Sequence, residues 1–172
     1  MFRHCLTAIL AALLFAGSAH AQTPAAPAAP AAPAAAPAAG GADDQLTAGK
    51  ATYMMTCIAC HQITGAGLFP VFPPLTKSPY VNGSAERLIA IILKGNIGPF
   101  TVDGKPFNNI MPPQEMLPFM TDDKVAAVAT YVRANFGNTG GPITAEQVAA
   151  ARKKFADRKT SWTQPELDAW KD

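Results

Sequence analysis

The chain of 172 residues is long enough for one domain of ordinary size plus additional sequence, and 49% of its residues are hydrophobic. Charged residues make up 15% of the chain and the formal net charge is only +2. The composition therefore excludes a disordered polyelectrolyte, and it gives no concentrated basic surface of the kind that nucleic-acid binding requires. We expect no nucleic-acid partner.

The N-terminus has the pattern of a secretory signal peptide. A weakly basic start precedes an apolar run over residues 6–16, and Ala19-His20-Ala21 follows as a cleavage site. A membrane span is the alternative, but an apolar run of about eleven residues is shorter than the roughly 20 that a bilayer requires. We therefore expect residues 1–21 to be removed on export to the periplasm, which leaves no transmembrane segment in the mature chain.

An alanine- and proline-rich segment, residues 22–42, follows the signal peptide. Between Thr23 and Ala39, proline occurs at nearly every third or fourth position. Proline at this spacing removes amide donors and prevents the helix that alanine otherwise favours. The segment is predicted to be an extended, semi-rigid linker.

Three helices are predicted within the next segment, residues 43–139, from apolar residues at helical spacing. Acidic residues precede the first helix, Ser84 the second and Thr121 the third, as helix N-termini favour. Gly95 and Gly137 are expected to end the second and third helices. The predicted helices cover residues 46–55, 85–95 and 122–136.

The connections between these helices are predicted to be largely irregular. Asp103-Gly104, flanked by apolar residues, predicts a short hairpin over residues 100–107. The proline-rich stretches 65–79 and 108–118 are predicted to have no regular structure. Two irregular segments of this length in a domain of about 100 residues need something large on which to pack.

Residues 140–172 are predicted to form a helical extension. A capping box over residues 144–147 opens a fourth helix, which is expected to run to about Lys159. Trp162 and Trp170 follow, and they either fold back on the domain's own surface or contact a partner. Our hypothesis is that the tryptophans anchor the extension while a basic cluster steers an acidic redox partner. The basic cluster consists of Arg152, Lys153, Lys154, Arg158 and Lys159.

The residues Cys57-Ile58-Ala59-Cys60-His61 have the C-x-x-C-H spacing of a c-type haem attachment site. Two thiols one helical turn apart can add to the two vinyl groups of one porphyrin, and the next residue places an imidazole at the iron. A thioredoxin-like redox pair lacks its strand-helix-strand surroundings here. A structural zinc site requires four ligands, and the processed chain offers only three cysteine or histidine side chains. The motif therefore predicts one haem c, attached through Cys57 and Cys60.

Further residues on both sides of this motif complete a family pattern: Gly49-Lys50 and Tyr53, Gly65-Ala66-Gly67, Pro73-Pro74-Leu75 and Tyr131. With them, residues 45–138 resemble a class I cytochrome c. The resemblance implies an all-α fold, a small cytochrome c fold of three to four helices around one covalent haem, with a short hairpin before the ligand loop and an extra C-terminal helix. It also implies that Gly49 allows close helix crossing. Pro73 and Leu75 are implied to contact the haem, and the Pro73 carbonyl is implied to accept the N–H of His61.

The second iron ligand is sought among neutral donors, because no second histidine remains after processing. The candidates are the methionines Met54, Met55, Met111, Met116 and Met120. Met54 and Met55 lie just before Cys57, on the wrong side of the porphyrin. Met111, which precedes a proline, matches the family's ligand loop, so His61 and Met111 are the expected metal ligands. Lysine ligation and an open site are the alternatives, and Met116 and Met120 are predicted to be packing residues.

An iron with histidine and methionine ligands has no vacant position, so the expected function is outer-sphere transfer of one electron and not enzyme catalysis. Residues 131–148 resemble the end of cytochromes that accompany periplasmic alcohol or sugar dehydrogenases. The expected partners are a periplasmic dehydrogenase, a terminal oxidase or a reductase. The alternative is a haem enzyme or gas sensor with an open or labile distal site, although no histidine after His61 remains to serve it as acid or base.

Overall fold

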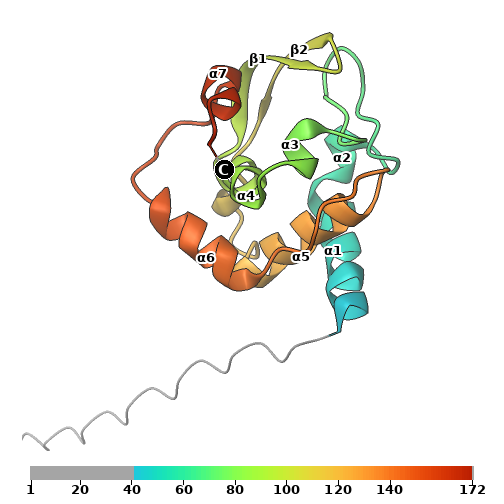
Figure 1. The fold of residues 1–172 in the computed structure, drawn as a ribbon, viewed down its shortest axis with the longest axis vertical. Coiled ribbons are helices and arrows are strands. Elements are labelled where there is room, and N and C mark those ends of the chain that lie inside the picture. Colours follow the sequence, from blue (N-terminus) through green and yellow to red (C-terminus); the bar gives the residue numbers. More distant parts are fainter. Residues whose placement is uncertain (1–40, 172) are drawn as a thin grey trace, which may run out of the picture. The chain divides into compact units, whose positions relative to one another are not determined.

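The structure is a computed structural model that describes residues 41–171. The predicted signal peptide (1–21) and nearly all of the predicted linker (22–42) lie outside these residues. Among the described helices, none has the length and apolar character that crossing a membrane requires. In chain order, the elements are α1 (Ala42–Thr56), α2 (Ile58–His61), α3 (Pro79–Asn82), α4 (Ala85–Lys94), β1 (Asn96–Val102), β2 (Lys105–Met111), the 3-10 helix η1 (Gln114–Met116), α5 (Asp122–Ala134), α6 (Ala145–Lys154) and α7 (Gln164–Asp168) (Figure 1).

Helices α1 and α5 cross in direct contact at Gly49 (Figure 1). A Cβ atom at Gly49 would overlap the carbonyl oxygen of Ala127, so the crossing leaves no room for a side chain. Next to the crossing, the fully buried Tyr53 ring lies 5.5 Å from the ring of Tyr131 and 5.3 Å from that of Phe136. This contact forms one side of the main core, to which α4 and α6 also contribute.

The helix limits follow local capping signals, except where a distant contact intervenes. Ser84 and Thr121 cap α4 and α5, and each side-chain oxygen accepts a backbone N–H, as predicted. Helix α5 ends at Ala134, before the predicted limit at Phe136, because Phe136 has a φ of 58° and packs its ring on Tyr53. The tertiary contact outweighs the helical spacing at this end.

The hairpin between α4 and η1 is longer than the sequence predicts. Asp103 and Gly104 form its two-residue turn with φ of 50° and 71°, as a type I′ turn requires. The strands pair as far as Asn96 and Met111, so residues 108–111 belong to β2 and are not irregular. The run of prolines that suggested an irregular segment begins only after Met111.

The C-terminal extension packs onto the domain. The predicted capping box of α6 is present, but α6 ends at Lys154 and not near Lys159, because the chain turns at Phe155. The Phe155 ring packs against Trp162 and Trp170, with ring centroids 5.4 and 5.8 Å apart. Helix α7, which the sequence did not predict, then lies beside β1 (Figure 1). Of the two alternatives for the tryptophans, the structure shows folding back onto the domain.

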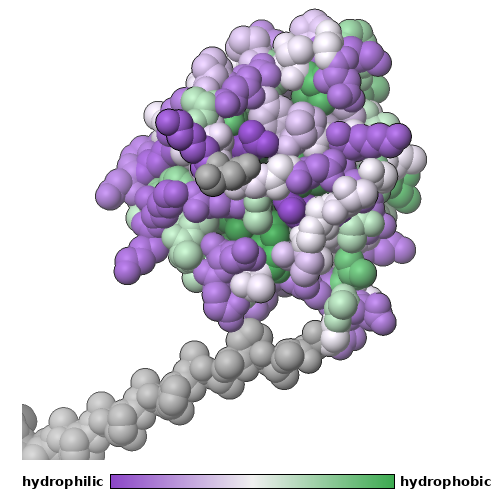
Figure 2. All heavy atoms as spheres, in the orientation of Figure 1, coloured by the Kyte–Doolittle hydropathy of each residue, from purple (hydrophilic) through white to green (hydrophobic). Residues whose placement is uncertain are grey.

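Most of the basic cluster is paired within the chain. Its members reach carboxylates on α4, on α5 and in α7, so their charge is partly compensated where they lie. The pairs are Arg152 with Asp122, Lys154 with Glu86, and Arg158 with Glu166. Over the described residues, Lys153 and Lys159 are the members of the cluster without an ion pair. The face seen in Figure 2 is accordingly hydrophilic in most places, with small apolar areas between the charged side chains.

We predict that Gly49→Ala lowers the free energy of unfolding by about 1–3 kcal/mol, because the added methyl group forces α1 and α5 apart. Denaturation of the haem-loaded protein with guanidinium chloride measures this loss. Gly141→Ala is the matched control, since a Cβ atom at Gly141 meets nothing within 4 Å. Equal losses in the two variants would contradict the close crossing.

Candidate functional site

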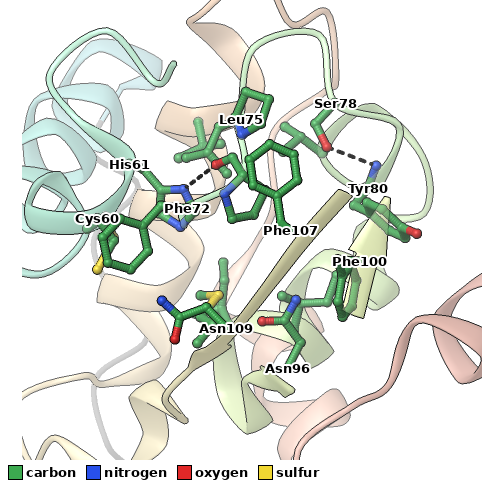
Figure 3. A pocket seen from close by; sticks show the side chains of 18 of the residues that line it. Cys60, His61, Phe72, Leu75, Ser78, Tyr80, Asn96, Phe100, Phe107 and Asn109 are labelled. Atoms are coloured by element: carbon green, nitrogen blue, oxygen red, sulfur yellow. Dashed lines mark hydrogen bonds between the residues drawn. The ribbon is translucent and has the colours of Figure 1, made fainter. Parts of the chain in front are cut away.

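A pocket lies between α2, the loop that follows it, α4, α5 and the inner face of the hairpin (Figure 3). Its walls are mainly apolar, which is typical of a site for a large apolar ligand. The apolar side chains that line it are Val71, Phe72, Pro73, Pro74, Leu75, Val81, Leu88, Ile91, Ile92, Phe100, Val102, Phe107, Ile110, Met111, Pro112, Met120, Val128 and Val132. A large ligand bound in this pocket would give the irregular loops of the domain a surface on which to pack.

Cys57 and Cys60 line the pocket from the junction of α1 and α2. Both are free thiols, and about one helical turn separates them. Burial is the main cause that raises the pKa of the Cys57 thiol, and the neighbouring Cys60 adds to it. A thioredoxin-like pair instead requires a lowered thiol pKa, so this environment does not support that alternative.

The buried His61 presents one ring nitrogen to the protein and the other to the pocket (Figure 3). Its Nδ1–H donates to the carbonyl oxygen of Pro73, with 3.1 Å between the two atoms. Because a carbonyl only accepts, this bond fixes the proton on Nδ1 and leaves the Nε2 lone pair free. Burial lowers the pKa of His61, with the Pro73 bond as a weaker opposing effect, so the ring is neutral at pH 7. A neutral imidazole is the form that binds a metal.

The loop after His61 is closed tightly enough to hold Pro73 in place. Gly67 donates its N–H to the carbonyl oxygen of His61 at 3.1 Å, and Leu75 donates to that of Gly65 at 2.7 Å. Both glycines have positive φ, 68° at Gly65 and 65° at Gly67. A side chain at Gly67 would overlap the carbonyl oxygen of Phe72, so glycine is needed there.

Asn138 ties this loop to the end of α5. Its side-chain amide donates to the carbonyl oxygens of Leu75, at 3.0 Å, and of Val132, at 2.9 Å. Its side-chain oxygen accepts from the amide of Asn82 at 2.9 Å. Sequence reasoning missed this role, because an asparagine just after a helix end is also typical of a simple turn.

The hairpin supplies the wall that faces His61. Strand side chains alternate between faces, and the register turns one residue in two toward the pocket. These residues are Asn96, Gly98, Phe100 and Val102 on β1, and Phe107, Asn109 and Met111 on β2, and Ile110 joins them at the end of β2. In Figure 3, Asn96 and Asn109 lie on the side of the pocket opposite His61. Met111, at the end of β2, belongs to the same face of the hairpin.

The structure thus brings all the site residues expected from the sequence to one pocket: Cys57, Cys60, His61, Pro73, Leu75 and Met111. The other methionines differ in their surroundings. Met54 and Met55 are 42% and 66% exposed. Met120 packs in the core, as predicted, and it also lines the pocket, from the segment before α5 and not from the hairpin. The prediction that Met116 is a packing residue is wrong, because its side chain is 74% exposed.

This set of donors suits a covalently attached haem better than a zinc ion. Within residues 41–171, no group of three or more histidine, cysteine or acidic side chains is arranged to hold a metal ion. Two free thiols, a neutral imidazole with a free Nε2 and the thioethers of Met111 and Met120 instead surround an apolar space. These residues fit a c-type haem, with thiols for its vinyl groups and nitrogen and sulfur for its iron.

Comparison with known proteins agrees with this fit. The family model for cytochrome c matches residues 46–135. Cytochrome c-552 of Thermus thermophilus is 32% identical over 107 residues, which cover 57% of this chain and 79% of that protein.

Subunits of larger assemblies are also similar to this chain. The fructose dehydrogenase cytochrome subunit of Gluconobacter japonicus is 32% identical over 113 residues, which cover 62% of this chain and 22% of that protein. The cytochrome c subunit of the quinone alcohol dehydrogenase of Gluconacetobacter polyoxogenes is 27% identical over 128 residues, which cover 71% of this chain and 26% of that protein. With over half of its length matched by the family model, this chain belongs to the cytochrome c family and carries a covalently bound c-type haem.

Proposed function

We propose that this protein is a periplasmic one-electron carrier, either free or as the electron-transfer subunit of a dehydrogenase. Cys57 and Cys60 attach its single haem, and His61 and Met111 are the iron ligands. One observation carries the proposal: His61 lines the pocket from one side with Nε2 free, and the hairpin face that bears Met111 lines it from the other. Family membership supports the coarser function, electron transfer.

When bound, the haem supplies a one-electron iron couple. The chain's own residues decide how that couple behaves. The Pro73 carbonyl orients the His61 ring and raises its basicity as a ligand. The Met111 thioether raises the reduction potential relative to a second nitrogen donor. The apolar walls limit access of water, which also tunes the potential.

The polar side chains around the pocket do not favour an enzyme or a gas sensor. Asn96 and Asn109, on the hairpin side, are carboxamides and do not exchange protons at neutral pH. The Tyr80 hydroxyl donates to Asp168 at 2.6 Å, and burial together with this carboxylate raises the pKa of Tyr80 to about 12. Tyr80 is therefore a poor acid or base at pH 7.

The proposed location and partners follow from the sequence pattern and from the relatives. We propose residues 1–21 as a signal peptide, 22–42 as a tether, 43–139 as the cytochrome domain and 140–172 as its extension. Some relatives are cytochrome subunits of dehydrogenases, but this chain spans only about a quarter of their length. A periplasmic dehydrogenase is accordingly the proposed electron donor, and a terminal oxidase or reductase the acceptor.

We predict that Cys57→Ala and Cys60→Ala each weaken or abolish covalent haem attachment, because each removes one of the two thiols at the pocket. Mass spectrometry of protein from a host that attaches haem c measures the mass bound to the polypeptide. Cys5→Ala is the control, because Cys5 lies in the proposed signal peptide, and it should leave the attached mass unchanged. Attachment that depended on Cys5 would contradict the assignment.

We predict that Met111→Ala gives a high-spin, ligand-accessible iron and removes the near-infrared sulfur-to-iron band of the oxidised protein. The potential should fall by on the order of 0.1 V, since axial ligands shift haem potentials over a range of roughly 0.8 V. Met116→Ala is the matched control, because Met116 is 74% exposed and does not line the pocket. If Met116→Ala removed the band and Met111→Ala kept it, the ligand assignment would be wrong.

A further inference from the structure

The outer edge of β1 is covered by the C-terminal extension. Trp162 pairs with Asn96 as a single parallel bridge. The N–H of Trp162 donates to the carbonyl oxygen of Gly95 at 3.0 Å, and its carbonyl oxygen accepts from the N–H of Ile97 at 2.8 Å. On its other side, Asn96 pairs with Met111 across the hairpin. Only β1 therefore separates Trp162 from Met111. Trp162 makes backbone hydrogen bonds to Gly95 and Ile97, which flank Asn96, the residue that pairs with Met111.

Gln164 makes a second contact with the same edge. Its side-chain oxygen accepts from the N–H of Thr101 at 2.7 Å, and its side-chain nitrogen donates to the carbonyl oxygen of Thr101 at 3.2 Å. The amide of Gln164 thus imitates the backbone of a neighbouring strand. Pro99, between the two contacts, has no N–H that needs a partner. Residues 162–164, which we call the C-terminal brace, take the place of a third strand.

The brace is itself fixed to α4. The indole N–H of Trp162 donates to the carbonyl oxygen of Ala90 at 3.0 Å, and the side chain is only 8% exposed. The rings of Phe155 and Trp170 each lie 5.4 Å from the Trp162 ring, and the guanidinium of Arg158 lies 3.5 Å from it. The brace therefore ties the edge of the hairpin to α4 and to the aromatic side chains of the extension.

The hairpin needs such support, because a two-stranded hairpin alone is only marginally stable in water. Its base is tightly packed at the same place. A side chain at Gly95 would overlap the carbonyl oxygen of Met111, so the start of β1 and the end of β2 are in contact. A displacement of Asn96 away from the pocket therefore displaces Met111 with it.

We propose that Trp162 and Gln164 are positioning residues that keep the Met111 thioether at the haem. This inference rests on the proposed role of Met111 as iron ligand. The extension lies outside the segment matched by the family model. According to this inference, it lowers the rate at which the thioether leaves the iron.

The rate at which imidazole binds to the oxidised, haem-loaded protein tests this role. At high imidazole concentration this rate approaches the rate at which the thioether leaves. Gln164→Ala removes two hydrogen bonds to Thr101 and one to the Tyr80 hydroxyl, and it should raise this rate about fivefold to tenfold. Trp162→Phe, which loses the bond to Ala90 but keeps a ring, should change the rate in the same direction. The near-infrared sulfur-to-iron band should weaken in both variants.

Gln147→Ala is the matched control for Gln164→Ala. It removes the same side chain from the same extension, but Gln147 forms its hydrogen bonds with Thr144, at the start of its own helix. If the wild-type protein shows the sulfur-to-iron band and Gln164→Ala leaves the imidazole rate unchanged, the positioning role of the brace is refuted. Met111 then remains the ligand. A rise of equal size in Gln147→Ala would also refute this positioning role, because the cause would be general destabilisation. Wild-type protein without the band would overturn the role of Met111 and the brace with it.

Discussion

The close crossing of α1 and α5 at Gly49 is the contact on which the haem site depends. Helix α1 leads directly into Cys57, so a fixed α1 places the start of the attachment motif. Beyond the end of α5, Asn138 donates into the loop that contains Pro73. The same helix pair therefore positions both the thiols that hold the porphyrin and the carbonyl that orients His61. A side chain at Gly49 is therefore expected to disturb the haem site, although Gly49 does not line the pocket.

The extension of residues 140–172 is held to the domain mainly by apolar burial. Trp162 and Leu167 are buried, and each such side chain contributes about 1.5–3 kcal/mol relative to an exposed one. The ion pairs of the basic cluster are partly exposed, and pairs of this kind typically contribute about 0–1 kcal/mol. Since three of its five charges already have partners within the chain, the cluster leaves little free charge to steer another protein.

Local patterns in the sequence predicted the attachment motif and the capped helix starts, because these signals act over a few residues. They failed where a distant contact decides the structure. Phe136 and Phe155 end their helices early because their rings pack on other aromatic side chains. The role of Asn138 and the pairing of Trp162 with Asn96 were also missed. Their partners are more than 60 residues away in the sequence, and no local pattern indicates such a contact. At the site, the candidate haem-binding residues could be predicted from the sequence, but the hydrogen bonds and packing contacts that position them could not.

The aromatic cluster of the extension has an optical consequence. Both tryptophans of the chain belong to it, with ring centroids 5.4 Å apart, and one of them contacts the helix that forms a wall of the pocket. Haem absorbs light at the wavelengths that tryptophan emits, so it quenches the fluorescence of nearby indole rings. The emission should stay weak while the extension is docked and recover when it detaches. Intrinsic fluorescence therefore reports whether the extension is docked, while the visible absorption bands report the state of the iron.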